Sequence, residues 1–274
     1  RDVERSRGLG DVYKRQAVYA AEIPVSDQDQ LITSRDWTEI SNLQDEMKKE
    51  EPDATIDYDK ALKVYVDCNL IKLQTADTKK LTSALESANY VWVIPFKMEK
   101  TYGMFTVAKG LPLSEEAKSV LTKAEQEEVK NHAGKWMITE TAEHTVEPYY
   151  DILLEKREAL SDCTRVVLVG SQPGMRQPVA LGMDDETARI WISLGYQYPV
   201  MEKIPETQNV ESGVYSFDSV AEISDTYIED SEVSTGAGVQ SRSSMKYVAG
   251  IGIIVIGSIL ILSVLKKKKL EDYE

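Results

Sequence analysis

The chain has 274 residues, of which 42% are hydrophobic, 28% charged and 8% aromatic, a balance that excludes collagen-like, wholly disordered and multi-span membrane proteins. The 46 acidic side chains outnumber the 32 basic ones, and the net charge of -14 argues against a nucleic-acid-binding protein because phosphate backbones are repelled. The length allows one or two domains.

The first twenty residues read as cloning and processing sequence. Residues 6–16 resemble one reading frame of a transposon-type sequencing adapter, so we assign residues 1–16 to an adapter scar; the alternative is the basic start of a signal peptide. Residues 17–20 read as a signal-peptide remnant, with Val18 and Ala20 at the minus-three and minus-one positions of a cleavage site. A plain extended segment would look the same.

Residues 21–204 are expected to form an extracytoplasmic α+β domain with a mixed or antiparallel sheet, hairpins and several helices. Helices are expected after Thr33 or Ser34, after Asp77 and from Pro148, and one long helix is expected after Ser114, ending near residues 131–134. Strands are expected at residues 62–66, 90–96, 104–108, 136–138, 166–169, 179–181 and 189–193. The first of them alternates apolar and polar residues, which predicts a half-buried strand.

Residues 36–109 and 114–194 share the order helix, strand, helix, hairpin. This leaves open two degenerate halves of a duplication, although the halves lack convincing residue identity and a single domain is favoured. Residues 205–246 are rich in Ser, Thr, Gly and acids, which is typical of a flexible acidic stalk. The alternative is that apolar residues there, such as Val214, Phe217 and Ile223, dock on the domain or on a partner.

A transmembrane helix is predicted at residues 247–265, from Tyr247 to Leu265, because 19 residues without a charge cover about 28 Å as a helix. Four lysines, Lys266 to Lys269, follow at once and place residues 266–274 in the cytoplasm and the preceding domain outside. A buried core helix and a sortase sorting signal are the alternatives. The sorting signal is disfavoured because residues 232–236 keep Thr-Gly and lack Leu-Pro.

The candidate contact site is the glycine-rich segment after the predicted strand at 166–169. It lacks the Lys-Ser/Thr ending and the following helix of a phosphate-binding loop, so we interpret it as a turn. Met175 and Arg176 are expected at its exposed tip. The contact loop comprises Gly170, Ser171, Met175 and Arg176.

Cys68 follows one predicted strand and Cys163 precedes another, so a disulfide between them stays open beside two free thiols. The chain has two histidines, His132 and His144, and no zinc, EF-hand or serine-hydrolase motif, so we expect no catalytic residue, metal ligand or cofactor. Carboxylates are the remaining acid/base groups. Asp67 and Asp162, beside the two cysteines, are the first candidates for a hydrolase.

Together these features favour a single-pass cell-surface protein of a bacterial cell, with an extracytoplasmic domain that binds or scaffolds an unidentified protein or glycan. Two alternatives stay open: a carboxylate-dependent extracytoplasmic hydrolase, and an accessory subunit of an envelope transport or secretion complex. Nucleic acid is not an expected partner.

The orientation is tested by protease treatment of intact cells. We expect the protease to remove the chain up to about Ser244 and to leave the lysine-containing tail, because only the tail lies inside. An antibody against each end distinguishes the two fragments. A protected domain would contradict the predicted orientation.

Overall fold

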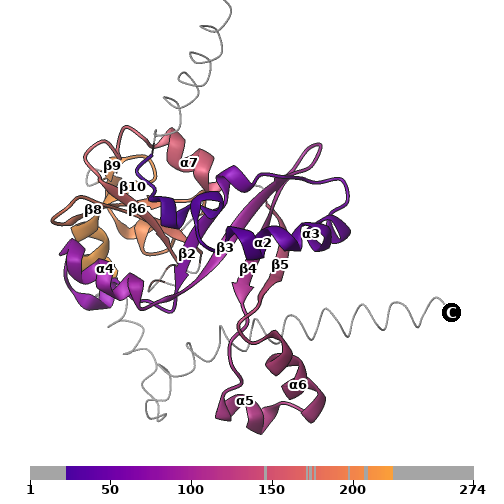
Figure 1. Cartoon of the computed structure of the whole chain (residues 1–274). Helices are drawn as coiled ribbons and strands as arrows, with labels where there is room; N and C mark the ends of the chain where they lie inside the picture. The colour runs from indigo at the N-terminus through magenta and orange to yellow at the C-terminus, as the bar shows by residue number, and fades with distance from the viewer. Residues whose placement is uncertain are drawn as a thin grey trace, which may run out of the picture.

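A computed structural model describes residues 23–144, 147–170, 172, 175, 177–196, 198–206 and 209–224. These residues form a ten-stranded mixed sheet with helices packed on it, which confirms the predicted α+β class (Figure 1). The assigned scar, signal-peptide remnant, transmembrane helix and tail lie outside the described residues. Within the described part, no helix has the length and apolar character needed to cross a bilayer.

The strands, in chain order, are β1 (Thr55–Ile56), β2 (Leu62–Val66), β3 (Asn89–Lys97), β4 (Tyr102–Lys109), β5 (Trp136–His144), β6 (Arg165–Val169), β7 (Val179–Met183), β8 (Ala188–Ser193), β9 (Asn209–Glu211) and β10 (Val214–Ser216). The α-helices are α2 (Trp37–Ile40), α3 (Gln44–Glu50), α4 (Thr78–Glu86), α5 (Glu115–Val120), α6 (Lys123–His132) and α7 (Tyr149–Glu155). Short 3-10 turns are η1 (Asp27–Asp29), η2 (Leu31–Thr33), η3 (Ser41–Leu43), η4 (Tyr58–Lys60), η5 (Ile71–Leu73) and η6 (Met201–Lys203), and residues 217–224 are also helical.

The sheet consists of two antiparallel meanders that meet at one parallel pairing. Its strand order is β5-β4-β3-β2-β6-β7-β8-β10-β9, with β1 paired to β3. The parallel pairing joins β2 to β6 and is short: Val64 lies opposite Leu168 and Tyr65 opposite Val169. Every other strand pair is antiparallel, so the β2–β6 contact is the seam of the sheet.

This topology does not place the two proposed halves in separate units of the sheet. Strand β5 belongs by sequence to residues 114–194, but it pairs with β4 at the outer edge of the first meander. The second meander begins only at β6. Strand pairing therefore groups β5 with the first meander, although the order of elements along the chain places β5 in the second proposed half.

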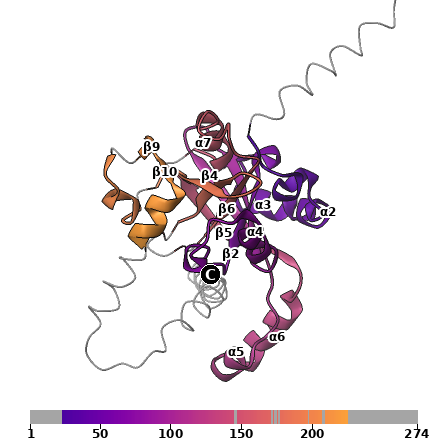
Figure 2. The ribbon, with the colours of Figure 1, turned by 90° about the vertical axis from the view of Figure 1, so that its left-hand side faces the viewer.

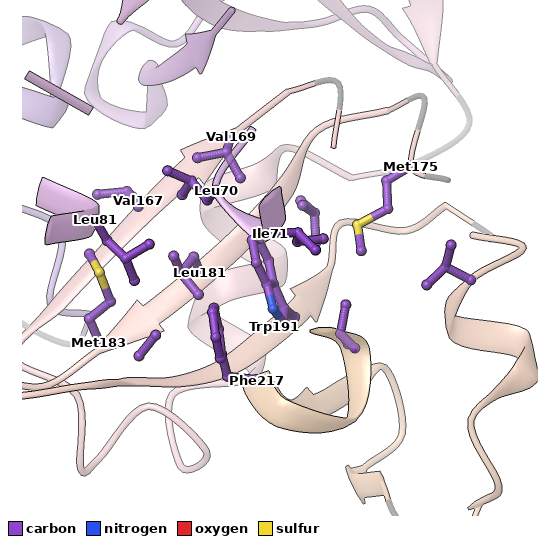
Figure 3. Close-up of a cluster of buried hydrophobic side chains, with 14 of the residues drawn as sticks. Leu70, Ile71, Leu81, Val167, Val169, Met175, Leu181, Met183, Trp191 and Phe217 are labelled. Atoms are coloured by element: carbon purple, nitrogen blue, oxygen red, sulfur yellow. The ribbon is translucent and has the colours of Figure 1, made fainter. Parts of the chain in front are cut away.

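Apolar side chains pack on both faces of the sheet, and most strands are therefore buried on both sides. On one face, α4 and residues 217–224 cover a cluster around Leu181 and Trp191, as Figure 3 shows, and α2 and α3 cover a second cluster around Trp92. On the opposite face, α7 covers a third cluster through Tyr149 and Leu153. Burial on both sides also includes β2, which the alternating pattern had predicted to be half-buried.

The folded domain extends past residue 204, so the predicted stalk is wrong for residues 209–224. Strand β10 pairs with β8, and the helix that follows packs on the sheet. Val214, Phe217 and Val220 are buried, and the ring of Phe217 stacks on Trp191 at 5.8 Å between centroids. A few apolar residues at favourable positions therefore secure a segment whose overall composition is polar. Residues 225–246 of the expected stalk lie outside the described residues.

The substitution Phe217→Ala tests this boundary. We expect it to lower the free energy of unfolding of the full chain by about 3–5 kcal/mol, because it leaves a cavity beside Trp191. Urea denaturation in detergent micelles, followed by tryptophan fluorescence, measures the change. Val210→Ala is the control: its side chain is 56% exposed in the same segment and should change the value by less than about 0.5 kcal/mol. Equal effects would mean that residues 209–224 do not pack.

Candidate functional site

The predicted contact loop packs inward where the structure describes it. Gly170 is buried and Met175 is 1% exposed, so the expectation of an exposed Met175 is wrong. The physical cause is Gln172, whose amide nitrogen donates to the carbonyl of Cys68 at 2.7 Å and whose oxygen accepts from the Leu70 N–H at 2.9 Å. These bonds hold the segment against the chain that leaves β2. Ser171 and Arg176 lie outside the described residues.

The two cysteines are free thiols, so the disulfide left open by the sequence is not formed. Cys68 follows β2 and Cys163 precedes β6, and parallel pairing puts these positions at opposite ends of the two strands. From the register the separation is about 30 Å along the strands. Burial raises the pKa of each thiol to about 11, so both are protonated at neutral pH and poorly nucleophilic.

The two acids named for a hydrolase do not form a pair. Asp67 and Asp162 are exposed, and they lie at opposite ends of β2 and β6 for the same reason as the cysteines. Asp67 accepts a hydrogen bond from the Asn89 amide at 3.0 Å. Among the described residues, no three His, Cys, Asp or Glu side chains gather closely enough to hold a metal ion.

A surface pocket of about 250 Å³ lies between the segment from η5 to α4 and the helix at residues 217–224. Its lining consists of Ile71, Gln74, Thr75, Ala76, Phe217, Asp218, Ala221 and Glu222. The volume is below the range of about 300–1,000 Å³ that is usual for small-molecule sites. Both acids of this lining, Asp218 and Glu222, are exposed, whereas a carboxylate pair for hydrolysis needs one carboxyl shielded from water.

The chain before η2 fills the gap at the seam of the sheet. Val25 forms a parallel bridge with Val166 of β6, and Gln30 forms an antiparallel bridge with Leu62 of β2. The Val166 N–H donates to the carbonyl of Pro24 at 2.7 Å. This segment, residues 23–31, thus lies between the starts of β2 and β6, where the two strands do not pair with each other.

Asp29 joins the two meanders through its buried carboxylate. It is 2% exposed; Oδ1 accepts from the Tyr65 hydroxyl at 2.7 Å, and Oδ2 accepts from Ser26 Oγ at 2.6 Å and Arg165 Nη2 at 3.0 Å. Lys63 Nζ lies 3.5 Å from Oδ1. Burial alone would raise the pKa of Asp29, but the hydrogen bonds from Ser26 and Tyr65 and the charge of Arg165 outweigh it and lower that pKa.

Aromatic rings surround the ammonium group of Lys63. Its Nζ lies 4.6 Å from the centroid of Tyr90, 5.3 Å from Trp92 and 5.6 Å from Tyr65. The Tyr90 hydroxyl and Trp92 Nε1 both donate to Asp36 Oδ2, at 2.8 and 3.1 Å. Burial lowers the pKa of Lys63, although the negative charges of Asp29 and Asp36 act to raise it. The rings and carboxylates already contact the lysine, so we interpret this group of residues as structural. We call it the seam cluster; it comprises Asp29, Asp36, Lys63, Tyr65, Tyr90, Trp92 and Arg165.

Residues 110–135, here called the arm, leave the sheet between β4 and β5. Figures 1 and 2 both show α5 and α6 projecting away from the rest of the domain. The neck of the arm is narrow: the Gly110 N–H donates to the Lys135 carbonyl at 2.9 Å, and the Gly134 N–H donates to the Gly110 carbonyl at 2.8 Å. A Cβ at Gly110 would lie 2.1 Å from the His132 carbonyl oxygen, so this close approach requires glycine.

The arm contains two short helices where the sequence predicted one long one. Ser114 Oγ caps α5 by accepting from the Ala117 N–H at 3.1 Å, as expected. The helix stops at Leu121, which is extended, because Thr122 and Glu125 form a capping box that begins α6. The Gln126 amide donates to the carbonyls of Lys118 and Leu121, at 3.0 and 2.9 Å, and ties the two helices together.

No arm residue whose burial is described is buried. Val120 is 73% exposed and Leu111 is 49% exposed; Val120 is the most exposed large apolar side chain of the described part. Helices of six and ten residues are too short to be stable in water without packing partners. The arm therefore presents apolar side chains that the domain itself does not cover. The sequence indicated them only through the apolar residues of the helix expected after Ser114.

Comparisons of the chain with protein-family models, with curated proteins and with solved structures return no match. The functional argument therefore rests on the residues and geometry given above.

The substitution Asp29→Asn tests the seam cluster. We expect a loss of about 3 kcal/mol in the free energy of unfolding at pH 7, because Lys63 and Arg165 then lose their buried counter-charge. The pKa of Asp29 is lowered in the folded state, so its stabilisation is complete above its unfolded value of about 3.9 and is lost as the pH falls from that value through the lower folded pKa. The variant should therefore show a weaker fall in stability below about pH 5 than the parent chain.

Urea denaturation between pH 3 and pH 8 measures both effects. Asp27→Asn is the matched control, because Asp27 is an exposed acid two residues away. If Asp29→Asn and Asp27→Asn gave the same pH profile, the buried ion pairs would not contribute to stability.

Proposed function

We propose that this chain is a membrane-anchored extracytoplasmic binding or scaffolding protein that contacts a protein partner through its arm. The observation that carries the proposal is the exposed apolar surface of the arm around Val120. Exposed apolar side chains on a projecting element are accessible to a partner without a change in the fold. Burial of Val120 and Leu111 by a partner would supply packing that two short helices lack.

The charge of the chain also favours contact at the arm. Residues 109–135 contain five lysines and five acids, whereas residues 21–245 contain 22 basic and 40 acidic residues. The excess of acids therefore lies entirely outside the arm and its flanking lysines. A partner of any charge can approach a neutral surface without the repulsion that an acidic one imposes on anions.

Anchoring is proposed from the apolar run at residues 247–265 and the lysines after it. The 22 residues from 225 to 246 can span at most roughly 75 Å when fully extended, enough to hold a domain of this size clear of the lipid headgroups. In this arrangement the arm can reach a partner in the envelope or on the cell surface.

The hydrolase alternative has less support from the geometry, because Asp67 and Asp162 lie at opposite ends of their strands. The described pocket adds two carboxylates, Asp218 and Glu222, but both are exposed to solvent. An accessory subunit of a transport or secretion complex would use the arm in the same way, with a membrane complex as its partner.

Site-specific photocrosslinking tests the proposal. A photoreactive side chain at Val120 should give crosslinked adducts of the full chain in intact cells, because that position is the centre of the exposed apolar surface. The same group at Lys79, an exposed position on α4, is the control and should give few adducts. Equal yields at both positions, or none at Val120, would contradict contact through the arm.

A further inference from the structure

We infer that the side chains of Lys63 and Asp29 form an intramolecular amide bond, which links the N-terminal segment at residues 23–31 covalently to β2. The reacting groups are the amine of a buried lysine and the carboxyl group that it faces at the seam of the sheet. The ion pair described above is their state before they react, and the titration of Asp29 belongs to that state. The inference concerns the seam and not the arm, so it is independent of the proposed function.

The first argument is proximity in a site from which water is largely excluded. Lys63 Nζ lies 3.5 Å from Asp29 Oδ1, and the carboxyl carbon is one bond beyond that oxygen. The two side chains are only 10% and 3% exposed. Groups that a fold holds together in this way can react with effective molarities of about 10⁵–10⁸ M. Exclusion of water also protects the product from hydrolysis.

The second argument is the set of hydrogen-bond donors around the carboxylate. Oδ2 of Asp29 accepts from Ser26 Oγ at 2.6 Å and from Arg165 Nη2 at 3.0 Å. Oδ1 accepts from the Tyr65 hydroxyl at 2.7 Å. When the nitrogen adds to the carboxyl carbon, negative charge develops on Oδ2, where Ser26 and Arg165 already donate. Donors fixed in advance stabilise such a tetrahedral intermediate.

The third argument is the environment of the amine. Lys63 Nζ lies 4.6 Å from the ring centroid of Tyr90 and 5.3 Å from that of Trp92. Asp36 fixes both rings by accepting from the Tyr90 hydroxyl and from Trp92 Nε1. Burial is the largest single influence on the pKa of Lys63 and of Asp29, and it favours the neutral form of each. The hydrogen bonds of Asp29 keep the ion pair as the resting state, but transfer of a proton from Nζ to the carboxylate costs less here than in water.

The step balances with these two groups alone. The Lys63 ammonium and the Asp29 carboxylate lose one water molecule between them: the Nζ–Cγ bond forms, the Cγ–Oδ1 bond breaks, and the two protons that leave the nitrogen depart with Oδ1. Oδ2 remains as the amide oxygen. The product removes two buried charges, and Arg165, whose side chain is 17% exposed, keeps Oδ2 as its acceptor.

Peptide mapping of the full chain tests the inference. The protein is purified in detergent, incubated at pH 7, fully denatured and digested with trypsin, and the peptides are sequenced by mass spectrometry. We expect a branched peptide that joins residues 61–72, through Lys63, to the peptide that contains Asp29 and ends at Arg35. Its mass should be lower by one water molecule than the sum of the two peptides. Trypsin does not cleave after an acylated lysine, so cleavage after Lys63 should be lost in most chains.

The ion pair of Lys60 and Asp151 is the internal control. Its Nζ–Oδ2 distance is shorter, at 2.8 Å, but the side chains are 34% and 27% exposed, so no branched peptide is expected there. Lys63→Arg keeps a positive charge beside Asp29 but removes the amine. This variant should give no branched peptide and should retain the circular dichroism spectrum of the parent chain.

The parent chain alone is sufficient to overturn the inference. Cleavage after Lys63 as complete as cleavage after Lys60 would show that the bond does not form. A branched peptide between Lys60 and Asp151 at the same yield would show that the bond forms without the buried site. Neither result affects the crosslinking at Val120, which tests the proposed function separately.

Discussion

The fold depends on one buried carboxylate. The two meanders share direct backbone pairing only at two residues of β2 and two of β6. Asp29 compensates by accepting hydrogen bonds from Tyr65 on β2 and from Arg165 on β6, while its own segment fills the gap between the strands. A buried basic group without a counter-charge is strongly destabilising, so Asp29 stabilises Lys63 and Arg165 in this position by supplying one.

This arrangement separates the stable part of the molecule from the part that is available for contact. The sheet is covered by apolar clusters on both faces, and its central ion pairs are shielded from solvent. The arm is joined to it by a neck of two glycines, and no arm residue whose burial is described is buried. Substitutions in the arm should therefore change binding with little effect on the fold, and substitutions at the seam should do the reverse.

The chemistry of the described residues agrees with a role in contact rather than reaction. The two thiols have pKa values raised by burial, and the acids first considered for catalysis are exposed and far apart. The seam cluster contains the buried ion pairs of Asp29 with Lys63 and Arg165, although Arg165 Nε itself has no hydrogen-bond partner. Val120 of the arm is the most exposed large apolar side chain of the described residues.

Local patterns in the sequence were sufficient for much of the secondary structure. The hairpins β3–β4 and β7–β8 are present as expected, because two apolar runs on either side of a turn form a local pattern of about twenty residues. Asp77 caps α4 and Ser114 caps α5 as predicted, since a cap depends on neighbours two or three residues away. The α+β class follows from these elements.

Contacts between distant residues decided the rest. The bonds of Asp29 span 36 residues to Tyr65 and 136 to Arg165, and no local pattern marks an acid near the N-terminus as the centre of a sheet. Local patterns also did not show that Met175 is buried or that Phe217 stacks on Trp191. The position of β5 beside β4 likewise follows from the strand order of the whole sheet. The sequence by itself determined the charge, the apolar run and most helices and strands before residue 204, although not the break between α5 and α6. The tertiary structure alone decided which of them meet, because burial and strand pairing depend on the whole chain.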